Sequence, residues 1–371
     1  MTMTAQKTAM ALATGLLLTT SAFAQTAPDF TVYGRLDLGI ENYNNGGFNR
    51  TMIQNYGSRF GVKGAREFSK DLSGIFQVET GIAPDDTTQS KSFASRNSFV
   101  GLKSNSMGTF LVGTYDTPLK SLDAGGYAGT LYGEGEAMEV VIHGKGTATV
   151  VPAAPNANFT NVHTRQSNNL VYLSPKFENF VAKVSYSPDE QTATIDAAKS
   201  PVTANTNQGL YSASLEWNNG TMNAGVATQT KLISDQPFAM TATKLTFGAK
   251  FGAFSGAIVV SSLDNQARLT ANVRKTSNAL VVLNYVDGPL TYKFNTGYSG
   301  ESAANALDDF QMYALEAAYA LDKNTTVYGG LAQILTNAKS KATFVAADNA
   351  PGLSAAGADP TAVTFGIRYN F

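Results

Sequence analysis

The end of the chain decides the fold, because Val363-Thr364-Phe365-Gly366-Ile367-Arg368-Tyr369-Asn370-Phe371 alternates between large apolar residues and small or polar ones. A period of two places the apolar side chains on one face, which is the pattern of a strand that is wet on the other face. An aromatic residue that ends such a strand suits the closing strand of a barrel. We therefore expect Phe371 to lie at a membrane rim.

The same alternation recurs through the chain. It is clear in the segments 211–217, 244–251, 290–298 and 313–319, where apolar residues occupy every second position. A soluble β-sandwich would show the same pattern locally, so the alternation alone predicts strands and leaves their environment open.

The spacing of turns separates these alternatives. Short turn signals rich in Gly, Asn, Asp, Ser and Pro are centred near residues 69, 105, 176, 219, 252, 288 and 322. Most intervals are about 33 to 43 residues, enough for two strands of about 9 to 11 residues, one short turn and one longer loop. Seven turns and eight long loops join sixteen strands, twice what a sandwich uses. Aromatic residues beside the turns, such as Trp217 and Tyr285, suit the girdles of a membrane barrel.

The N-terminus has the pattern of a secretory signal peptide. Lys7 precedes an apolar core, and Ala22-Phe23-Ala24 is a small-x-small cleavage sequence. We expect residues 1–24 to be removed and 25–371 to form one barrel domain, the alternative being a buried N-terminal helix. Beyond residue 24 no apolar run reaches the roughly 18 to 20 residues of a membrane helix.

Composition excludes several classes of protein. The chain of 371 residues has no Cys, which rules out a disulfide framework and thiolate metal sites. Its formal net charge is −1, so no overall field attracts nucleic acid. Charged residues make up 15%, against about 25% in typical soluble domains.

One segment is too long for the regular spacing. The interval between the second and third turns is about 71 residues, and the excess lies in 117–164, after the fifth predicted strand. A loop of this length is uncommon unless it is functional or disordered. Its carboxylates include Asp123, Glu134 and Glu136. Folded into a wide lumen, it would narrow the pore.

Several motifs resemble those of the Gram-negative trimeric porins, especially the β-proteobacterial general porins. They are Tyr33-Gly34-Arg35-Leu36-Asp37, Ser58-Arg59-Phe60-Gly61-Val62-Lys63-Gly64, Ile75-Phe76-Gln77-Val78-Glu79, Arg96-Asn97-Ser98-Phe99-Val100-Gly101-Leu102 and Tyr369-Asn370-Phe371. The resemblance implies an all-β fold, a transmembrane 16-stranded antiparallel β-barrel with its long third loop folded into the lumen. It also implies a homotrimer in the outer-membrane lipid of a Gram-negative cell. Its function would be passive diffusion of ions and small hydrophilic solutes.

The resemblance further implies a constriction where wall arginines face acidic residues of the third loop. By position the wall residues are Arg35, Arg59, Arg96 and Arg165, and the loop residues are Asp123, Glu134 and Glu136. Alternation places Arg35 and Arg59 opposite apolar neighbours, whereas both faces around Arg96 are apolar. Each arginine could equally be an ordinary solvated rim charge. After the fifth strand the family usually has Gly-Arg, whereas this chain has Gly113-Thr114-Tyr115-Asp116. A usual positive charge is thus missing near the start of the long loop, so the sequence leaves ion selectivity open.

Other chemistry finds little support. The two histidines, His143 and His163, lack metal-ligand spacing, and the strands carry no histidine for a catalytic triad. We expect no enzyme activity, metal or cofactor. Asp85 and Asp86 could bind a divalent cation or cap a loop. Two alternatives stay open: a substrate-specific channel for a sugar or small organic solute, stacked on Tyr115, Tyr127 and Tyr132, and a non-conducting structural barrel.

Overall fold

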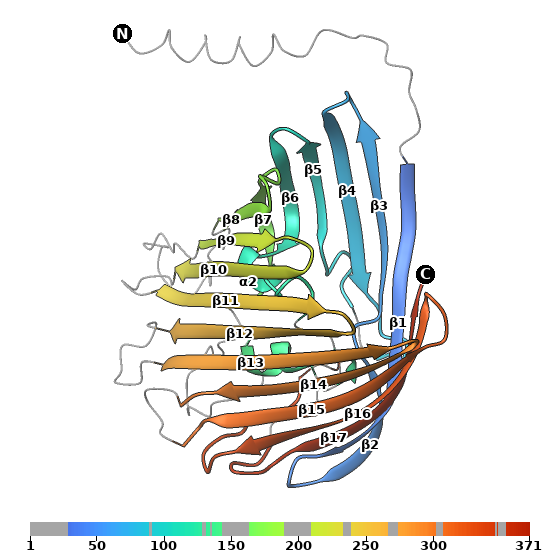
Figure 1. The fold of residues 1–371 in the computed structure, drawn as a ribbon, viewed down its shortest axis with the longest axis vertical. Helices are drawn as coiled ribbons and strands as arrows, with labels where there is room; N and C mark the ends of the chain where they lie inside the picture. The colour runs from blue at the N-terminus through green and yellow to red at the C-terminus, as the bar shows by residue number, and fades with distance from the viewer. Residues whose placement is uncertain are drawn as a thin grey trace, which may run out of the picture.

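The chain forms one antiparallel sheet that closes on itself (Figure 1). The computed structural model describes residues 29–88, 91–127, 131–133, 136–142, 163–188, 209–232, 239–265, 274–301, 307–345, 347 and 354–371. The strands are β1 (Asp29–Asn44), β2 (Asn49–Asn55), β3 (Arg59–Glu67), β4 (Leu72–Gly81), β5 (Ser98–Ser104), β6 (Gly108–Asp116), β7 (Arg165–Leu173), β8 (Phe180–Ser187), β9 (Leu210–Asn218), β10 (Met222–Leu232), β11 (Ala239–Phe251), β12 (Phe254–Asn265), β13 (Arg274–Asp287), β14 (Leu290–Ser299), β15 (Phe310–Ala320), β16 (Thr325–Thr336) and β17 (Thr361–Asn370). The predicted signal peptide, residues 1–24, lies outside the described residues.

The last strand closes the barrel, as its alternation predicted. Residues 361–370 of β17 pair antiparallel with residues 35–44 of β1. The seam ends with Phe371, whose N–H donates to the Gly34 carbonyl (3.1 Å) and whose carbonyl accepts from the Gly34 N–H (2.9 Å). A Cβ at Gly34 would clash with the Phe371 ring, so glycine makes the space that the terminal ring occupies. That this ring lies at the membrane rim stays a prediction.

Seventeen strand segments make sixteen barrel strands, because β2 and β3 are two parts of one strand. Both pair with β1, β2 with its second half and β3 with its first. Between the register pairs Leu38↔Asn55 and Arg35↔Arg59, the second strand has one residue more than β1. An extra residue shifts the side-chain alternation by one position. The shift directs Arg59 inward, whereas continued alternation from Gln54 would direct it outward.

All seven predicted short turns are present. They join β3 to β4, β5 to β6, β7 to β8, β9 to β10, β11 to β12, β13 to β14 and β15 to β16. The expectation of a long loop after every second strand is wrong for the first hairpin, since only residues 45–48 separate β1 from β2. There the side chain of Asn45 accepts from the N–H groups of Gly47 and Phe48, which closes a tight turn without added chain.

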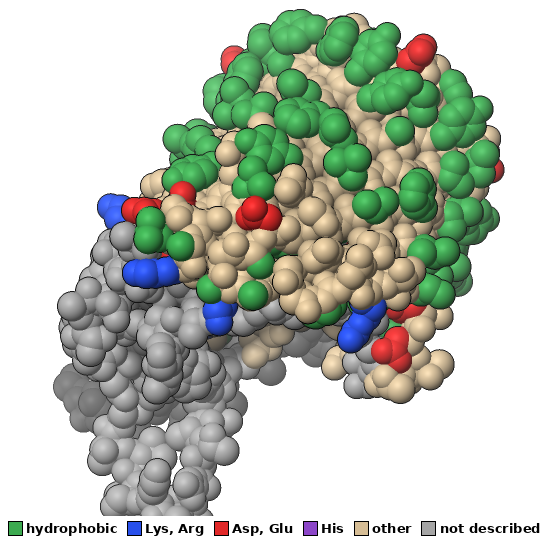
Figure 2. All heavy atoms as spheres, turned by 90° about the horizontal axis from the view of Figure 1, so that it is seen from below, with side chains coloured by type: hydrophobic (Ala, Val, Ile, Leu, Met, Phe, Trp, Pro, Cys, Tyr) green, Lys and Arg blue, Asp and Glu red, His purple; other side chains and the backbone are tan. Residues whose placement is uncertain are grey.

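The outer face of the barrel is apolar. Exposed side chains at alternate positions include Leu245 and Phe247 of β11, Leu315 of β15 and Phe365 of β17. Figure 2 shows hydrophobic side chains spread over one rounded face, with charged ones mainly toward its lower edge. Such a face suits contact with lipid. Among the described residues, no helix is long and apolar enough to cross a membrane.

The inner face is polar, and part of it is covered by the segment 117–164 that joins β6 to β7. Two short helical turns belong to this segment, α2 (Pro118–Ser121) and η2 (Met138–Ile142). Leu119 and Leu122 pack on inward residues of β10 to β12, and Val140 to Ile142 pack with Val259, Leu280 and Val282 of β12 and β13. The described parts of this segment thus pack against the inner face on one side of the barrel, and the inward side chains of Arg59 and Lys63 on β3 keep exposed surface.

Candidate functional site

Two arginines face each other on the inner wall beside the seam. Arg35 of β1 and Arg59 of β3 are direct cross-strand partners and are half-buried. Like charges placed opposite one another repel. Among the described residues, no carboxylate comes within ion-pair distance of either guanidinium, because the nearest ones, on Asp37 and Glu79, bind other arginines. The structure therefore directs two positive charges without an ion pair of their own inward, as alternation predicted for both, and Asp37 and Glu79 act on them only from a greater distance.

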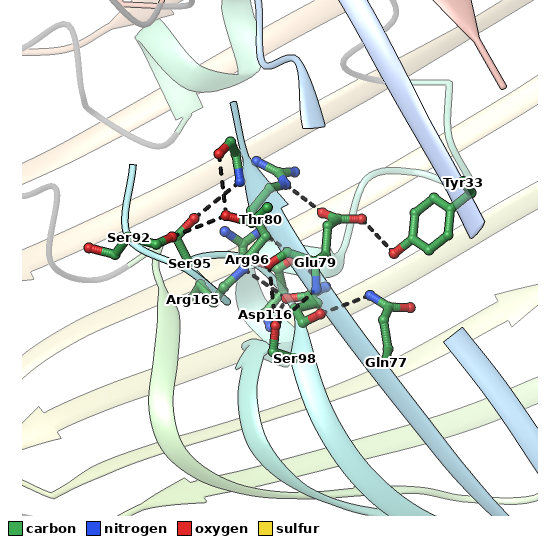
Figure 3. Close-up of polar contacts among 12 residues, drawn as sticks. Tyr33, Gln77, Glu79, Thr80, Ser92, Ser95, Arg96, Ser98, Asp116 and Arg165 are labelled. Carbon is green, nitrogen blue, oxygen red and sulfur yellow. Dashed lines mark hydrogen bonds and ion pairs between the residues drawn. The ribbon is translucent and has the colours of Figure 1, made fainter. Parts of the chain in front are cut away.

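Arg96, for which alternation gave no direction, is held by Glu79 of β4 (Figure 3). Its Nε donates to Glu79 Oε1 at 2.5 Å, and its backbone N–H donates to the Glu79 carbonyl at 3.1 Å. The other carboxylate oxygen accepts from the hydroxyl of Tyr33 at 2.8 Å. Arg96 lies close enough to Arg59 for electrostatic repulsion, so three arginines gather here with one carboxylate between them.

Arg165 begins β7 and binds Asp116, the residue that departs from the family pattern. Its NH2 lies 3.2 Å from Asp116 Oδ1, and its Nε donates to Asn97 Oδ1 at 2.8 Å. Lys120 of α2 approaches the same carboxylate at 3.7 Å. Asp116 thus balances the charge of Arg165 (Figure 3), and the place of Arg165 at a constriction stays a prediction.

The loop carboxylates occupy two different places. Asp123 Oδ1 accepts from the N–H of Gly126 at 3.0 Å, and its nearest cations are Lys244 and Lys183 of the wall. Enclosure of the Glu136 carboxyl within the protein, together with the nearby carboxylate of Glu139, raises the pKa of Glu136 to about 8. Glu136 is therefore largely neutral at pH 7. Glu134 and His143 lie outside the described residues.

Sequence reasoning missed a second group of charges, next to the arginines. Arg368 of β17 binds Asp37 of β1, its cross-strand partner, with Nε 2.6 Å from Oδ2. Lys293 of β14 binds Glu316 of β15 at 2.8 Å. The signal was present in the sequence, since these residues lie on the polar faces of alternating strands. Their pairing depends on strand register, which alternation does not give.

The remaining candidates for binding chemistry do not assemble a site. Within the described ranges, no group of three or more His, Asp or Glu side chains could hold a metal ion. Asp86 caps its loop, since its Oδ1 accepts from the N–H of Thr88 at 2.8 Å and from the hydroxyl at 2.6 Å. His163 is buried beside the start of β7. The arrangement as a whole is a charged, partly open interior, suited to acting on ions by electrostatics.

Sequence comparison identifies a family. A family model described as Gram-negative porin matches residues 8–339. The major outer membrane protein P.IB of Neisseria gonorrhoeae is 27% identical over 186 residues, which cover 48% of this chain and 48% of that protein. The P.IB of Neisseria lactamica is similarly related, at 27% over 183 residues, covering 44% of this chain and 46% of that protein. The chain thus spans about half the length of the curated relatives it matches.

Structural comparison gives the same fold over nearly the whole chain. The anion-selective porin of Comamonas acidovorans superposes with a TM-score of 0.71 at 20% identity, covering 93% of this chain and all of that one. The trimer form of OmpT, an outer membrane protein of Vibrio cholerae, superposes with a TM-score of 0.66 at 15% identity, again covering 93% and 100%. At these identities the likeness shows the fold alone.

Proposed function

The chain belongs to the Gram-negative porin family, and on that premise we propose that it is an outer-membrane channel for passive diffusion of ions and small hydrophilic solutes. The observation that carries the proposal is the divided interior. The described parts of the loop, around α2 and η2, pack on the inner side of β10 to β14, and the wall at β1 and β3 keeps charged side chains partly exposed. Water and solutes would pass between these two sides.

We propose that Arg35, Arg59 and Arg96 form the wall of the constriction and that the loop bearing Asp123, Glu134 and Glu136 forms the opposite side. Support comes from the inward direction of Arg35 and Arg59 and from the contact of Arg96 with Glu79 beside them (Figure 3). We further propose a preference for anions at neutral pH. Arg35 and Arg59 have no paired carboxylate among the described residues, and the raised pKa of Glu136 removes one opposing charge. Arg165 contributes less, since Asp116 neutralises it.

The wider setting follows the family. We propose that residues 1–24 are a cleaved signal peptide, that 25–371 form the mature barrel in the outer-membrane lipid, and that three copies associate. Support for the trimer comes from the OmpT of Vibrio cholerae, whose structure is of a trimer form. We propose a channel without catalytic activity, in keeping with the porin family to which the chain belongs. An unheated sample that migrates as a trimer in a mild detergent gel, and as a monomer after boiling, would support the assembly.

The decisive experiment is single-channel recording of the refolded protein in a planar bilayer. The proposal expects stepwise conductance that does not saturate with salt, and a reversal potential of anionic sign in a KCl gradient. Detergent without protein and unfolded protein are the controls. A refolded barrel that gives no conductance steps would overturn the channel assignment and favour a structural barrel.

A substrate-specific channel receives no support from the tyrosines that suggested it. The ring of Tyr115 packs edge-on against Phe99, with centroids 5.4 Å apart. Tyr132 is enclosed by wall residues, and Tyr127 packs against the apolar cluster beneath the loop. Each of these rings keeps some exposed surface but already packs on protein neighbours, which leaves less of it for stacking on a sugar.

A further inference from the structure

The ring of Tyr132 lies between two cations of the barrel wall. Lys293 Nζ of β14 is 3.6 Å from the ring centroid, and Arg368 Cζ of β17 is 3.9 Å from it. A cation over an aromatic face is attracted by the ring quadrupole, and the attraction grows where water is excluded. We propose that Tyr132 is a positioning residue, whose ring clamps the loop 117–164 to the wall and thereby sets the open width of the channel.

Residues of the barrel wall and of the loop both contribute to the packing of the Tyr132 ring. The ring of Tyr328 of β16 packs at a tilt of 40° against Tyr132 with centroids 4.9 Å apart, and its hydroxyl donates to Asp37 Oδ1 at 2.9 Å. Gly366 of β17 lies directly under the Tyr328 ring, where any Cβ would clash. The next loop residue, Gly133, has φ of +61° and packs against Thr364, a close approach that favours glycine. Three strands, β14, β16 and β17, thus contact this one side chain.

The charges around the ring are balanced, so the clamp places no unpaired cation under the loop. Glu316 Oε1 binds Lys293 Nζ at 2.8 Å, and Oε2 of the same carboxylate accepts from the N–H of Tyr132 at 2.7 Å. Asp37 balances Arg368. Glu316 therefore holds both the backbone of Tyr132 and the Lys293 ammonium that contacts the Tyr132 ring. Lys293, Arg368 and Glu316 together fix the position of Tyr132.

Tyr132 matters for permeation because of where it holds the loop. On its N-terminal side the loop packs on β10 to β12 through Leu119 and Leu122, and on its C-terminal side it packs on β12 and β13 through Val140 to Ile142. Between these two packed segments, Tyr132 fastens the loop next to Arg368. Arg368 lies close enough to Arg35 for electrostatic repulsion. Without the Tyr132 ring, this part of the loop would lose its attachment next to Arg368. The distance between the loop and the wall arginines would then vary.

The inference rests on the proposed channel function, and the test separates the two. We would compare the unitary conductance and the polyethylene glycol size limit of the full-length, signal-processed protein with those of Tyr132→Ala, Tyr132→Leu and Tyr132→Phe. Loss of the ring should raise conductance roughly 1.5-fold to twofold in the Ala and Leu variants, with more open-channel noise, because conductance follows the open cross-section. Tyr132→Phe should match the wild type, since the ring face carries the contacts. Leu keeps apolar bulk but has no quadrupole, so it is the matched control for simple loss of packing.

A cross-link provides the rescue. The chain has no Cys, and a Cβ at Gly133 would lie 3.3 Å from the Thr364 Cβ, close to disulfide geometry. In the Tyr132→Ala background, Gly133→Cys with Thr364→Cys should form a disulfide, restore wild-type conductance when oxidised and lose it on reduction. Conductance in Tyr132→Ala or Tyr132→Leu equal to wild type, or a disulfide that forms and leaves the conductance of Tyr132→Ala unchanged, would overturn the clamp. A wild-type barrel that does not conduct would overturn the proposed function instead.

Discussion

Replacing Arg59 by glutamate reverses the charge of a side chain that faces the interior of the barrel and has no ion-pair partner among the described residues. Arg59 repels Arg96 and lies opposite Arg35. Because Glu79 is engaged by Arg96 and Tyr33, no carboxylate masks the change. The substitution should therefore alter the potential felt by a passing ion directly.

The size of the effect follows from Coulomb's law. A unit charge about 5 Å from a passing ion in water contributes about 0.8 kcal/mol. Screening at 0.1 M salt, where the Debye length is about 10 Å, reduces this to about 0.5 kcal/mol. Anions and cations respond with opposite sign, so Arg59→Ala should change their permeability ratio about fivefold and Arg59→Glu about 30-fold.

The assay is the reversal potential of single channels in a KCl gradient, which reports the permeability ratio. Arg59→Glu should move it toward cation preference, Arg59→Ala should move it about half as far, and raising the salt should reduce both shifts. Arg66→Glu is the matched control, because Arg66 lies on the same strand and on the opposite face, which points away from the interior of the barrel. Equal shifts in Arg59→Glu and Arg66→Glu, or no shift in either, would refute the placement of Arg59 at the constriction.

Three further predictions concern other residues. Arg165→Gln should shift the reversal potential less than Arg59→Ala, since Asp116 already balances Arg165. Asp116→Asn should increase the preference for anions. Equal shifts in Arg165→Gln and Arg59→Ala would show that Asp116 does not neutralise Arg165. A carboxyl with a raised pKa of about 8 is neutral below that value and gains charge above it, so cation permeability should rise between pH 7 and 9 and stay constant in Glu136→Gln. Deleting Phe371 removes two backbone hydrogen bonds to Gly34, where β17 meets β1. Refolding, measured by gel mobility, should therefore be slower in this variant and normal in Phe371→Tyr.

The sequence predicted what depends on local pattern. Period-two alternation gave the directions of Arg35 and Arg59, because a strand forces neighbouring side chains to opposite faces. The seven short turns were predictable for a similar reason, since tight turns need particular residues at adjacent positions. The extra residue between β2 and β3 did not affect the predicted direction of Arg59. That direction was inferred from Phe60 and Val62, which lie after the extra residue.

What depends on contact between distant segments could not be predicted. Arg96 meets Glu79, and Arg368 meets Asp37, only through strand register and closure of the barrel. Tyr132 was expected to stack on a solute, if on anything. Its actual neighbours come from β14, β16 and β17, and no local pattern links them to residue 132.

The pairing of charges shows where water reaches the interior. An unpaired charge is costly in a dry site and cheap in a wet one, so beneath the loop we expect cations to have carboxylates near them. Lys293 has Glu316, and even Lys244, fully buried with only a 3.5 Å bond to the Lys120 carbonyl, lies in the field of Asp123. On the opposite wall, Arg35 and Arg59 repel each other, and the carboxylates that act on them, Asp37 and Glu79, are bound to Arg368 and Arg96. A sheet can keep that cross-strand pair only if water or a passing anion solvates it, so the two arginines mark the wet side of the barrel independently of any family resemblance.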